Sequence, residues 1–295
     1  MASEHTEEVP TATLSAGRCH LGEGPTYDAS TDTAWWFDIL ERRLFEADIA
    51  SGRVKIHTLG KMASALARID AQRQLLVTED GLYIRHVADG RTELFAPLEA
   101  DNPATRSNDA RVHPSGTLWF GTMGRKAEPR MGAIYALHRG HILRLYPNIT
   151  IPNAICFAPG GDVGYFADTR RCVLNRVPLD PTTGLPVGDP TPIAEGVHGL
   201  DGAVVDTDGL IWNAHWGAGR VAVFDPAGKH LRSLRVPAKQ SSCPAFVGRD
   251  LSRLLVTSAW EHMDEAARAA DPGHGRTFVL DAGVRGRAEP DVRLG

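Results

Sequence analysis

Three short segments each place one oxygen-donor side chain a similar distance before an apolar strand core. The donors are Glu23 in LGEGP, Asn153 in PNAICF and Asp201 in LDGAVV, which precede Trp36, Tyr165 and Trp212 by 13, 12 and 11 residues. Taken singly, Asp and Asn are common turn residues. Together, two carboxylates and a carboxamide are hard oxygen donors that suit Ca²⁺, Mg²⁺ or Mn²⁺. The matched spacing favours a metal site over three unrelated turns.

A fourth segment, ATRSNDARVHPSG, extends this pattern. Asn108 lies 11 residues before Trp119, with Asp109 beside it and Arg106 just upstream. The similar spacing predicts that this segment contributes to the same site.

Cationic residues lie near these segments. Arg106, Arg125 and Lys126 indicate an anionic substrate, because guanidinium groups match carboxylates in a bidentate way. The alternative for Lys126 is a solvated loop charge. His215 follows the Asp201 segment, and two interpretations stay open for it: contact with substrate, or packing beside Trp216.

The elements that must position these residues repeat along the chain. The first residues of the repeated apolar pairs are Trp36, Leu76, Trp119, Tyr165, Trp212 and Leu255, with steps of 40, 43, 46, 47 and 43 residues. Alternating strands and turns rich in Asp, Pro and Gly follow each pair. This period is typical of a β-propeller. The sequence predicts an all-β fold, a six-bladed β-propeller with a central channel, over a β-sandwich with coincidental spacing.

The two ends of the chain are expected to differ. Residues 1–10 are predicted to be a disordered tail, and residues 11–295 a single propeller domain. TATLSAG near residue 11 could pair with TFVLDAG near the C-terminus and leave no open sheet edge. Residues 261–270 read as the one short helix.

Composition excludes several classes of function. A net charge of −4 and a pI near 6.3 give no basic surface for nucleic acid. Apolar runs fall far short of the roughly 20 residues that a membrane helix needs. Four cysteines without a C-x-x-C pair predict reduced thiols and a cytoplasmic protein.

Several motifs together resemble those of a known family. NDARVHPSGTLWFGTM, PNAICFAPGG and LDGAVVDTDGLIWNAHWGAGRV, with LGEGP before them, are similar to the regucalcin (senescence marker protein)/gluconolactonase family of six-bladed propellers. The resemblance implies one divalent metal ion in the channel and hydrolysis of sugar lactones. It implies Glu23, Asn153 and Asp201 as metal ligands, and substrate contacts from Arg106 and Asn108, with Asp109 beside them. The ion stays open among Ca²⁺, Zn²⁺, Mn²⁺, Mg²⁺ and Fe²⁺.

The chain departs from the family pattern at three places: after Asn153, after GTM, and before the last strand, where GHGRTF replaces a typical AGG. Ala154 follows Asn153 where the family has glycine, and Arg125 and Lys126 stand where many relatives carry an acidic residue. The second departure suggests an aldaric or uronic acid lactone as an alternative to a neutral aldonolactone.

The predicted reaction is attack of water on a lactone carbonyl polarised by the metal ion. Asp201 is assigned as the general base, because the resemblance points there and Glu23 between its glycines suits fixed ligation. Two other functions are weighed: a phosphotriesterase or aryl esterase with two metals, and a non-enzymatic calcium-binding propeller. The protein is expected to be a monomer or a weak homodimer.

Overall fold

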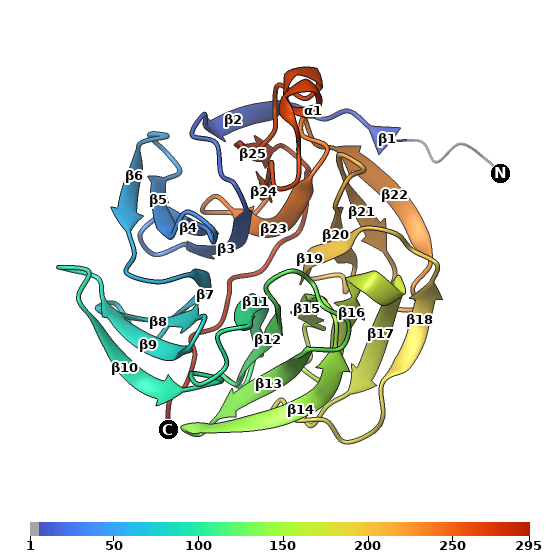
Figure 1. Cartoon of the computed structure of the whole chain (residues 1–295). Coiled ribbons are helices and arrows are strands. Elements are labelled where there is room, and N and C mark those ends of the chain that lie inside the picture. The colour runs from blue at the N-terminus through green and yellow to red at the C-terminus, as the bar shows by residue number, and fades with distance from the viewer. Residues whose placement is uncertain (1–5) are drawn as a thin grey trace.

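The computed structural model describes residues 6–295, which form six β-sheets arranged around a central axis (Figure 1). Each sheet is one blade of a β-propeller, so the predicted all-β, six-bladed fold is confirmed. The innermost strands of the blades are β3, β7, β11, β15, β19 and β23, and each contacts the next around the ring.

The strands follow the chain from the channel outward in blades one to four, and blades five and six add an N-terminal strand at their outer edge. Blade one contains β3 Gly22–Asp28, β4 Thr33–Asp38, β5 Arg43–Asp48 and β6 Val54–Thr58. Blade two contains β7 Ala63–Arg68, β8 Arg73–Thr78, β9 Gly81–His86 and β10 Thr92–Pro97. Blade three contains β11 Thr105–Val112, β12 Leu118–Gly124, β13 Gly132–His138 and β14 His141–Ile149.

The second half of the chain repeats this order. Blade four contains β15 Pro152–Phe157, β16 Val163–Asp168, the 3₁₀ turn η1 Thr169–Arg171, β17 Val173–Pro178 and β18 Thr191–Glu195. Blade five contains β19 Leu200–Val205, β20 Ile211–His215, β21 Arg220–Phe224 and β22 His230–Arg235. Blade six contains β23 Ser241–Val247, β24 Arg253–Ser258, α1 Glu265–Ala270 and β25 Thr277–Leu280.

The N-terminal strand closes the ring, as predicted. β2 Thr11–Ser15 pairs antiparallel with β25 and forms the outer strand of blade six. Residues 1–10 were expected to form a disordered tail. Residues 1–5 lie outside the described part, and residues 6–7 instead form a short strand. β1 Thr6–Glu7 pairs in parallel with β22, because Glu7 meets Arg232 at 3.1 Å and Val9 packs on the neighbouring core.

Apolar side chains fill the spaces between successive blades. The repeated aromatic residues Trp36, Trp119 and Trp212 are among the most deeply buried side chains. These packed layers fix the inner strands, which is what a site built from several blades requires.

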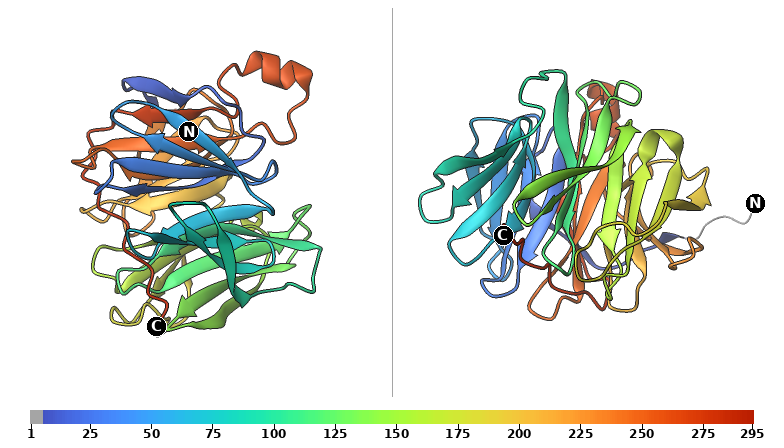
Figure 2. Two further views of the ribbon diagram at one scale, coloured as in Figure 1. Left: turned by 90° about the vertical axis from the view of Figure 1, so that its left-hand side faces the viewer. Right: turned by 90° about the horizontal axis from the view of Figure 1, so that it is seen from below.

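The two faces of the disc carry different features. α1 projects from the face where the inner strands begin, and residues 281–295 run across the opposite face (Figure 2). Within residues 6–295, no helix is long and apolar enough to cross a membrane. The four cysteines are free, as the sequence predicted.

Candidate functional site

The predicted metal ligands occupy equivalent register positions in three inner strands. The residue before each ligand pairs with the end of the second strand of its blade. The pairs are Gly22 with Asp38, Pro152 with Asp168, and Leu200 with His215. Glu23, Asn153 and Asp201 therefore lie at one level of the channel, near the face that carries α1.

The same register identifies the equivalent residue in the other three blades. Ala63 pairs with Thr78, Thr105 with Gly124, and Ser241 with Ser258. The equivalents of the ligand positions are therefore Ser64 and Ser242 and, in β11, which has one more pair before its bulge, Ser107. Asn108 lies one residue further on, in the bulge of β11 that begins after Ser107, and its predicted contact with substrate stays a prediction.

The two predicted carboxylate ligands are buried against each other. Glu23 and Asp201 are 7% and 5% exposed. Burial, followed by the charge of Asp109, raises the pKa of Glu23 to about 8. Burial, followed by the charge of Glu23, raises the pKa of Asp201 well above its ordinary value. The two side chains hydrogen-bond to each other, which requires one of them to carry a proton.

Asn153 is oriented by two hydrogen bonds. Its Oδ1 accepts from Asn108 Nδ2 at 2.9 Å, and its Nδ2 donates to Thr169 Oγ1 at 2.9 Å. Thr169 Oγ1 in turn donates to the carbonyl of Leu200 at 2.6 Å, next to Asp201. The carboxamide oxygen of Asn153 keeps a second lone pair for a further partner.

Arg106 and Asn108 are joined to this chain of contacts. Arg106 Nη1 donates to Asn108 Oδ1 at 2.9 Å and to the carbonyl of Ser107 at 2.8 Å. Arg106 is 5% exposed, and its Nε is buried without a partner among the described residues. A buried N–H donor of this kind is available to a ligand in the channel.

Asp109 supports the backbone of the next blade. Its Oδ2 accepts from the amide of Ile155 at 2.8 Å, inside the bulge of β15 that follows Asn153. Its Oδ1 is buried and has no hydrogen-bond partner in the described part of the chain. Burial, opposed by Arg111, raises the pKa of Asp109 to about 6. One oxygen thus has a structural role, and the other remains available.

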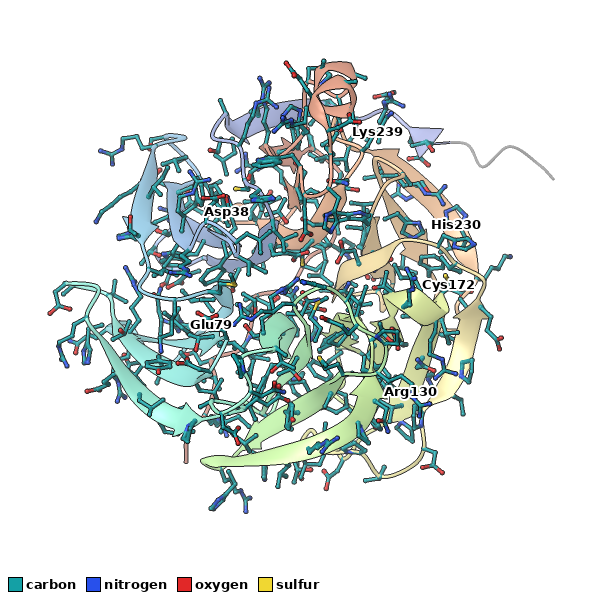
Figure 3. The ribbon with its side chains drawn as sticks, viewed as in Figure 1. Asp38, Glu79, Arg130, Cys172, His230 and Lys239 are labelled. Atoms are coloured by element: carbon teal, nitrogen blue, oxygen red, sulfur yellow. The ribbon has the colours of Figure 1, made fainter. Side chains whose placement is uncertain are left out.

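Two of the three predicted cationic residues, Lys126 and Arg125, differ from Arg106 in their surroundings. Lys126 is exposed, and its backbone amide donates to Glu128 Oε2 at 3.0 Å. Arg125 Nη2 lies 2.5 Å from Glu79 Oε2, and its Nε donates to the carbonyl of Pro103 at 2.7 Å. Glu79 lies beside the central opening (Figure 3). Of the three basic residues, Arg106 alone belongs to an inner strand, β11.

His215 lies outside the carboxylate cluster. It lines a recess between blades four and five with Glu195, Phe224 and His230, and it stacks on Phe224 with ring centroids 6.0 Å apart. The other predicted site residues do not line this recess. Packing is thus shown on one side of the His215 ring, and the contact with substrate stays a prediction.

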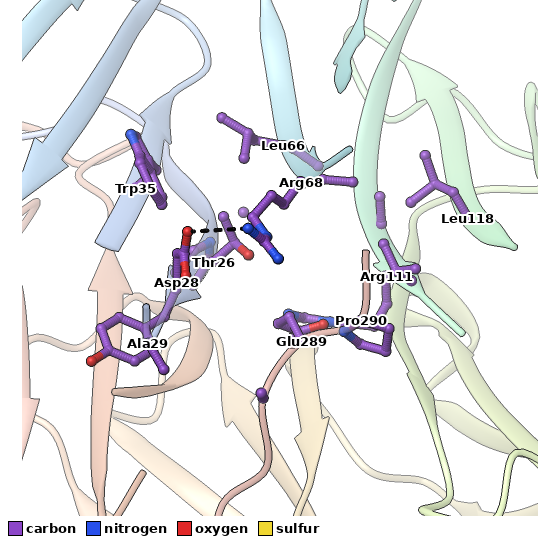
Figure 4. Close-up of a pocket in the computed structure, with 18 of the residues that line it drawn as sticks. Thr26, Asp28, Ala29, Trp35, Leu66, Arg68, Arg111, Leu118, Glu289 and Pro290 are labelled. Atoms are coloured by element: carbon purple, nitrogen blue, oxygen red, sulfur yellow. Dashed lines mark hydrogen bonds and ion pairs between the residues drawn. The ribbon is translucent and has the colours of Figure 1, made fainter. Parts of the chain in front are cut away.

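A second cavity occupies the opposite half of the channel (Figure 4). It has a volume of about 230 Å³ and is lined by β3, β7 and β11 below the ligand level, and by Glu289 and Pro290 of the C-terminal segment. Arg68 lies 3.8 Å from Asp28 at its wall. No pattern in the sequence predicted this cavity.

The donor set consists of two carboxylates and one carboxamide. Residues 6–295 contain no group of three or more His, Cys, Asp or Glu placed to hold a metal ion. The predicted set therefore depends on the amide oxygen of Asn153 as its third donor. Two buried carboxylates in contact, together with an available amide oxygen, suit a hard divalent ion, which would replace the shared proton.

Fold and site together define a six-bladed propeller with a cluster of oxygen donors at one mouth of its channel. The SMP-30/gluconolactonase/LRE-like region matches residues 21–260. The chain belongs to this family.

Individual relatives match over nearly the whole chain. The chain is 52% identical over 294 residues to "Putative sugar lactone lactonase" of Rhizobium meliloti (strain 1021), covering 98% of this chain and 100% of the relative. It is 34% identical over 289 residues to L-arabinolactonase of Azospirillum brasilense, covering 94% of each. Among solved structures, a calcium-binding protein, regucalcin, from Agrobacterium tumefaciens superimposes with a TM-score of 0.96 at 51% identity, covering 98% of this chain and 99% of that one.

Proposed function

We propose that this protein hydrolyses a sugar lactone to the open-chain acid, with one divalent metal ion held by Glu23, Asn153 and Asp201. The observation that carries the proposal is the contact between two buried carboxylates at equivalent positions of blades one and five. Membership of the lactonase family and the names of the relatives support it.

The metal ion would supply Lewis-acid polarisation of the lactone carbonyl and would lower the pKa of a bound water. The protein's own groups do the rest. Glu23 Oε2 accepts a hydrogen bond from the amide of Gly24 at 3.0 Å, which orients the carboxylate for ligation. Asp201 accepts the proton of the attacking water as general base. Arg106 Nε donates to an oxygen of the substrate, with Asn108 holding its guanidinium group.

The charges around the channel favour a neutral aldonolactone over an acidic one. Arg125 is paired with Glu79, and Lys126 is exposed, so neither is set to receive a substrate carboxylate. The similarity to L-arabinolactonase also supports a neutral aldonolactone as the substrate.

A second candidate is a calcium-binding protein without catalysis. The oxygen-only donor set and the similarity to the regucalcin described as calcium-binding favour it. The cytoplasmic location and a monomeric or weakly dimeric state stay predictions.

A pH-stat assay separates these candidates. The panel contains arabino-, xylono-, glucono- and galactaro-lactones, with an aryl ester and a phosphotriester for the esterase alternatives. Each substrate is tested after chelation and after return of Ca²⁺, Mn²⁺, Mg²⁺ or Zn²⁺. We expect metal-dependent hydrolysis of neutral lactones. No lactone hydrolysis with any ion would overturn the proposal, and calcium binding in that case would leave the second candidate.

A further inference from the structure

Two buried carboxylates behind the ligand cluster make the same pair of contacts in different blades. Asp38 accepts hydrogen bonds from the backbone amides of His20 and Leu21 at 2.9 and 3.2 Å. Asp168 accepts hydrogen bonds from the backbone amides of Thr150 and Ile151 at 3.0 and 3.1 Å. Both carboxylates are almost fully buried, at 0% and 3% exposed.

These contacts are matched relative to the predicted ligands. In blade one the two amides lie three and two residues before Glu23, and in blade four they lie three and two residues before Asn153. The backbone directly after each ligand is also alike, since Gly24 and Ala154 have φ of 55° and 53°. Both strands therefore have the same pair of amide–carboxylate hydrogen bonds before the ligand and the same left-handed residue directly after it.

The other blades do not share this arrangement. The residues at the same register position are Thr78, Met123, His215 and Ser258. Thr78 Oγ1 donates to the carbonyl of Gly81, and Ser258 Oγ donates to that of Arg276. Carboxylates thus occupy this position in two of the six blades, and both of those blades carry a predicted ligand.

Blade five holds its ligand in another way. Asn213 Nδ2 donates to the carbonyls of Asp201 and Gly202 at 2.6 and 3.2 Å. The backbone of Asp201 is therefore fixed at the ligand itself, from the second strand of its own blade. Blades one and four instead fix the backbone that leads into the ligand.

We propose that Asp38 and Asp168 are positioning residues for the metal centre, which aim Glu23 and Asn153 at a common point by holding the two amides before each ligand. Residues that orient metal ligands are needed for full affinity even though they do not touch the ion. The inference rests on the ligand set of the proposed function and adds two residues to it.

Asparagine is the sharpest substitution at both positions. An amide can accept through one of its two polar atoms, so Asp38→Asn and Asp168→Asn each lose one backbone contact with almost no change in size. The matched control is Asp206→Asn in blade five. Asp206 is also buried and accepts the amides of Asp208 and Leu210, but it lies at the far end of its strand pair.

The experiment titrates the chelator-treated full-length variants with Ca²⁺ and with Mn²⁺ by calorimetry, and records their melting temperatures. We expect Asp38→Asn and Asp168→Asn to weaken metal binding about 10-fold or more. Asp206→Asn should lower the melting temperature while leaving metal affinity unchanged. Equal metal affinity in all three variants and the wild type would overturn the proposal.

Thr169→Val keeps the test decisive if the aspartate variants do not fold. Thr169 is half-buried and accepts a hydrogen bond from Asn153 Nδ2, so its loss should weaken metal binding several-fold. Unchanged affinity would show that the orientation of Asn153 does not affect the metal ion, which would count against the proposal. A wild-type protein that binds neither ion would overturn the ligand set itself. Lactone hydrolysis by the wild type is measured separately, so failure of the catalytic function is distinguishable from failure of this inference.

Discussion

Charged side chains are paired differently at the two ends of the channel. At the end that carries α1, Glu23 meets Asp201, and both Arg106 Nε and Asp109 Oδ1 are buried without hydrogen-bond partners in the described chain. At the other end, Arg68 and Arg111 are ion-paired, and of these two only Arg111 Nε is buried without a hydrogen-bond partner in the described chain. Buried polar groups without partners cost free energy, so Arg106 Nε and Asp109 Oδ1 together favour a ligand at the end that carries α1.

The paired end is closed by the C-terminal segment. Glu289 Oε1 lies 2.7 Å from Arg111 Nη1, and Asp291 receives two hydrogen bonds from Arg68, at 2.7 and 2.9 Å. Burial acts to lower the pKa of Arg111, but Glu289 outweighs it and the pKa is raised. This end therefore supplies stability, whereas the ligand end supplies chemistry, and each substitution below tests that division.

The largest expected effect is at the proposed base. Asp201→Asn should lower kcat by roughly 100- to 10,000-fold, because the amide cannot accept the proton of the attacking water. The measurement is lactone hydrolysis under saturating metal, with bound metal counted by elemental analysis. Asp208→Asn, an exposed aspartate of the same blade, is the control. Full turnover in Asp201→Asn with metal bound would show that the base assignment is wrong.

Glu23→Gln should weaken metal binding by about 10- to 100-fold and reduce activity with it, because one of two anionic ligands becomes neutral. Titration with Ca²⁺ and a lactone assay at several metal concentrations measure both effects. If neither metal affinity nor activity falls, Glu23 is not a ligand.

The same substitution should stabilise the metal-free protein. The pKa of Glu23 is raised by burial to about 8 from an ordinary value of 4.5, so its unfavourable contribution is absent below pH 4.5 and grows as the pH rises toward 8. Glutamine removes that contribution. The gain in melting temperature of metal-free Glu23→Gln over wild type should therefore be larger at pH 7.5 than at pH 5, and an equal gain at both would refute the linkage.

Glu289→Gln should show the opposite pattern at the closed end. It leaves Arg111 buried without its partner charge, which costs about 2–3 kcal/mol after allowance for the partial exposure of Glu289. The melting temperature should fall by about 5 °C. Turnover and metal affinity at 25 °C should stay within about twofold of wild type by the same assays. A large loss of metal binding here would show that the two ends are not independent.

The sequence predicted the propeller and the level of the ligands because both depend on a repeat that is visible in the apolar pairs. The spacing alone did not give the exact register of each strand. Asn108 lies in the bulge of β11, and His215 lies at the end of β20, where it lines a recess with residues of blades four and five. These details depend on how the strands pair, which a single sequence does not show.

Other features depend on contacts between distant parts of the chain. Asp38 and Asp168 follow the apolar pairs, whereas the search for ligands covered the residues before them. Their position at the end of WWFD and YFAD is a signal that could have found them. The Arg111–Glu289 pair joins residues 178 positions apart, and nothing local marks either as a partner of the other.

The smallest expected effect sharpens the account of the ligand end. Ala154 holds φ of 53° directly after Asn153, where glycine is usual. A left-handed alanine costs about 1–2 kcal/mol. Ala154→Gly relieves that strain but loses a buried methyl group, worth about 0.8 kcal/mol, and adds freedom to the unfolded chain, worth about 0.4–1 kcal/mol. These terms nearly cancel, so the melting temperature should change by less than about 3 °C and metal affinity should not change.

Gly24→Ala is the matched substitution after Glu23, and its outcome should differ sharply. A Cβ there would lie 1.9 Å from the carbonyl oxygen of Ser64, so β3 or β7 must shift and Glu23 must move with it. Metal affinity and melting temperature should both fall. If Gly24→Ala is as mild as Ala154→Gly, the close approach of blades one and two does not hold Glu23 in place. If Gly24→Ala is severe and Ala154→Gly is mild, the left-handed backbone after a ligand can carry a side chain. The space beside that backbone then decides which residue can follow the ligand.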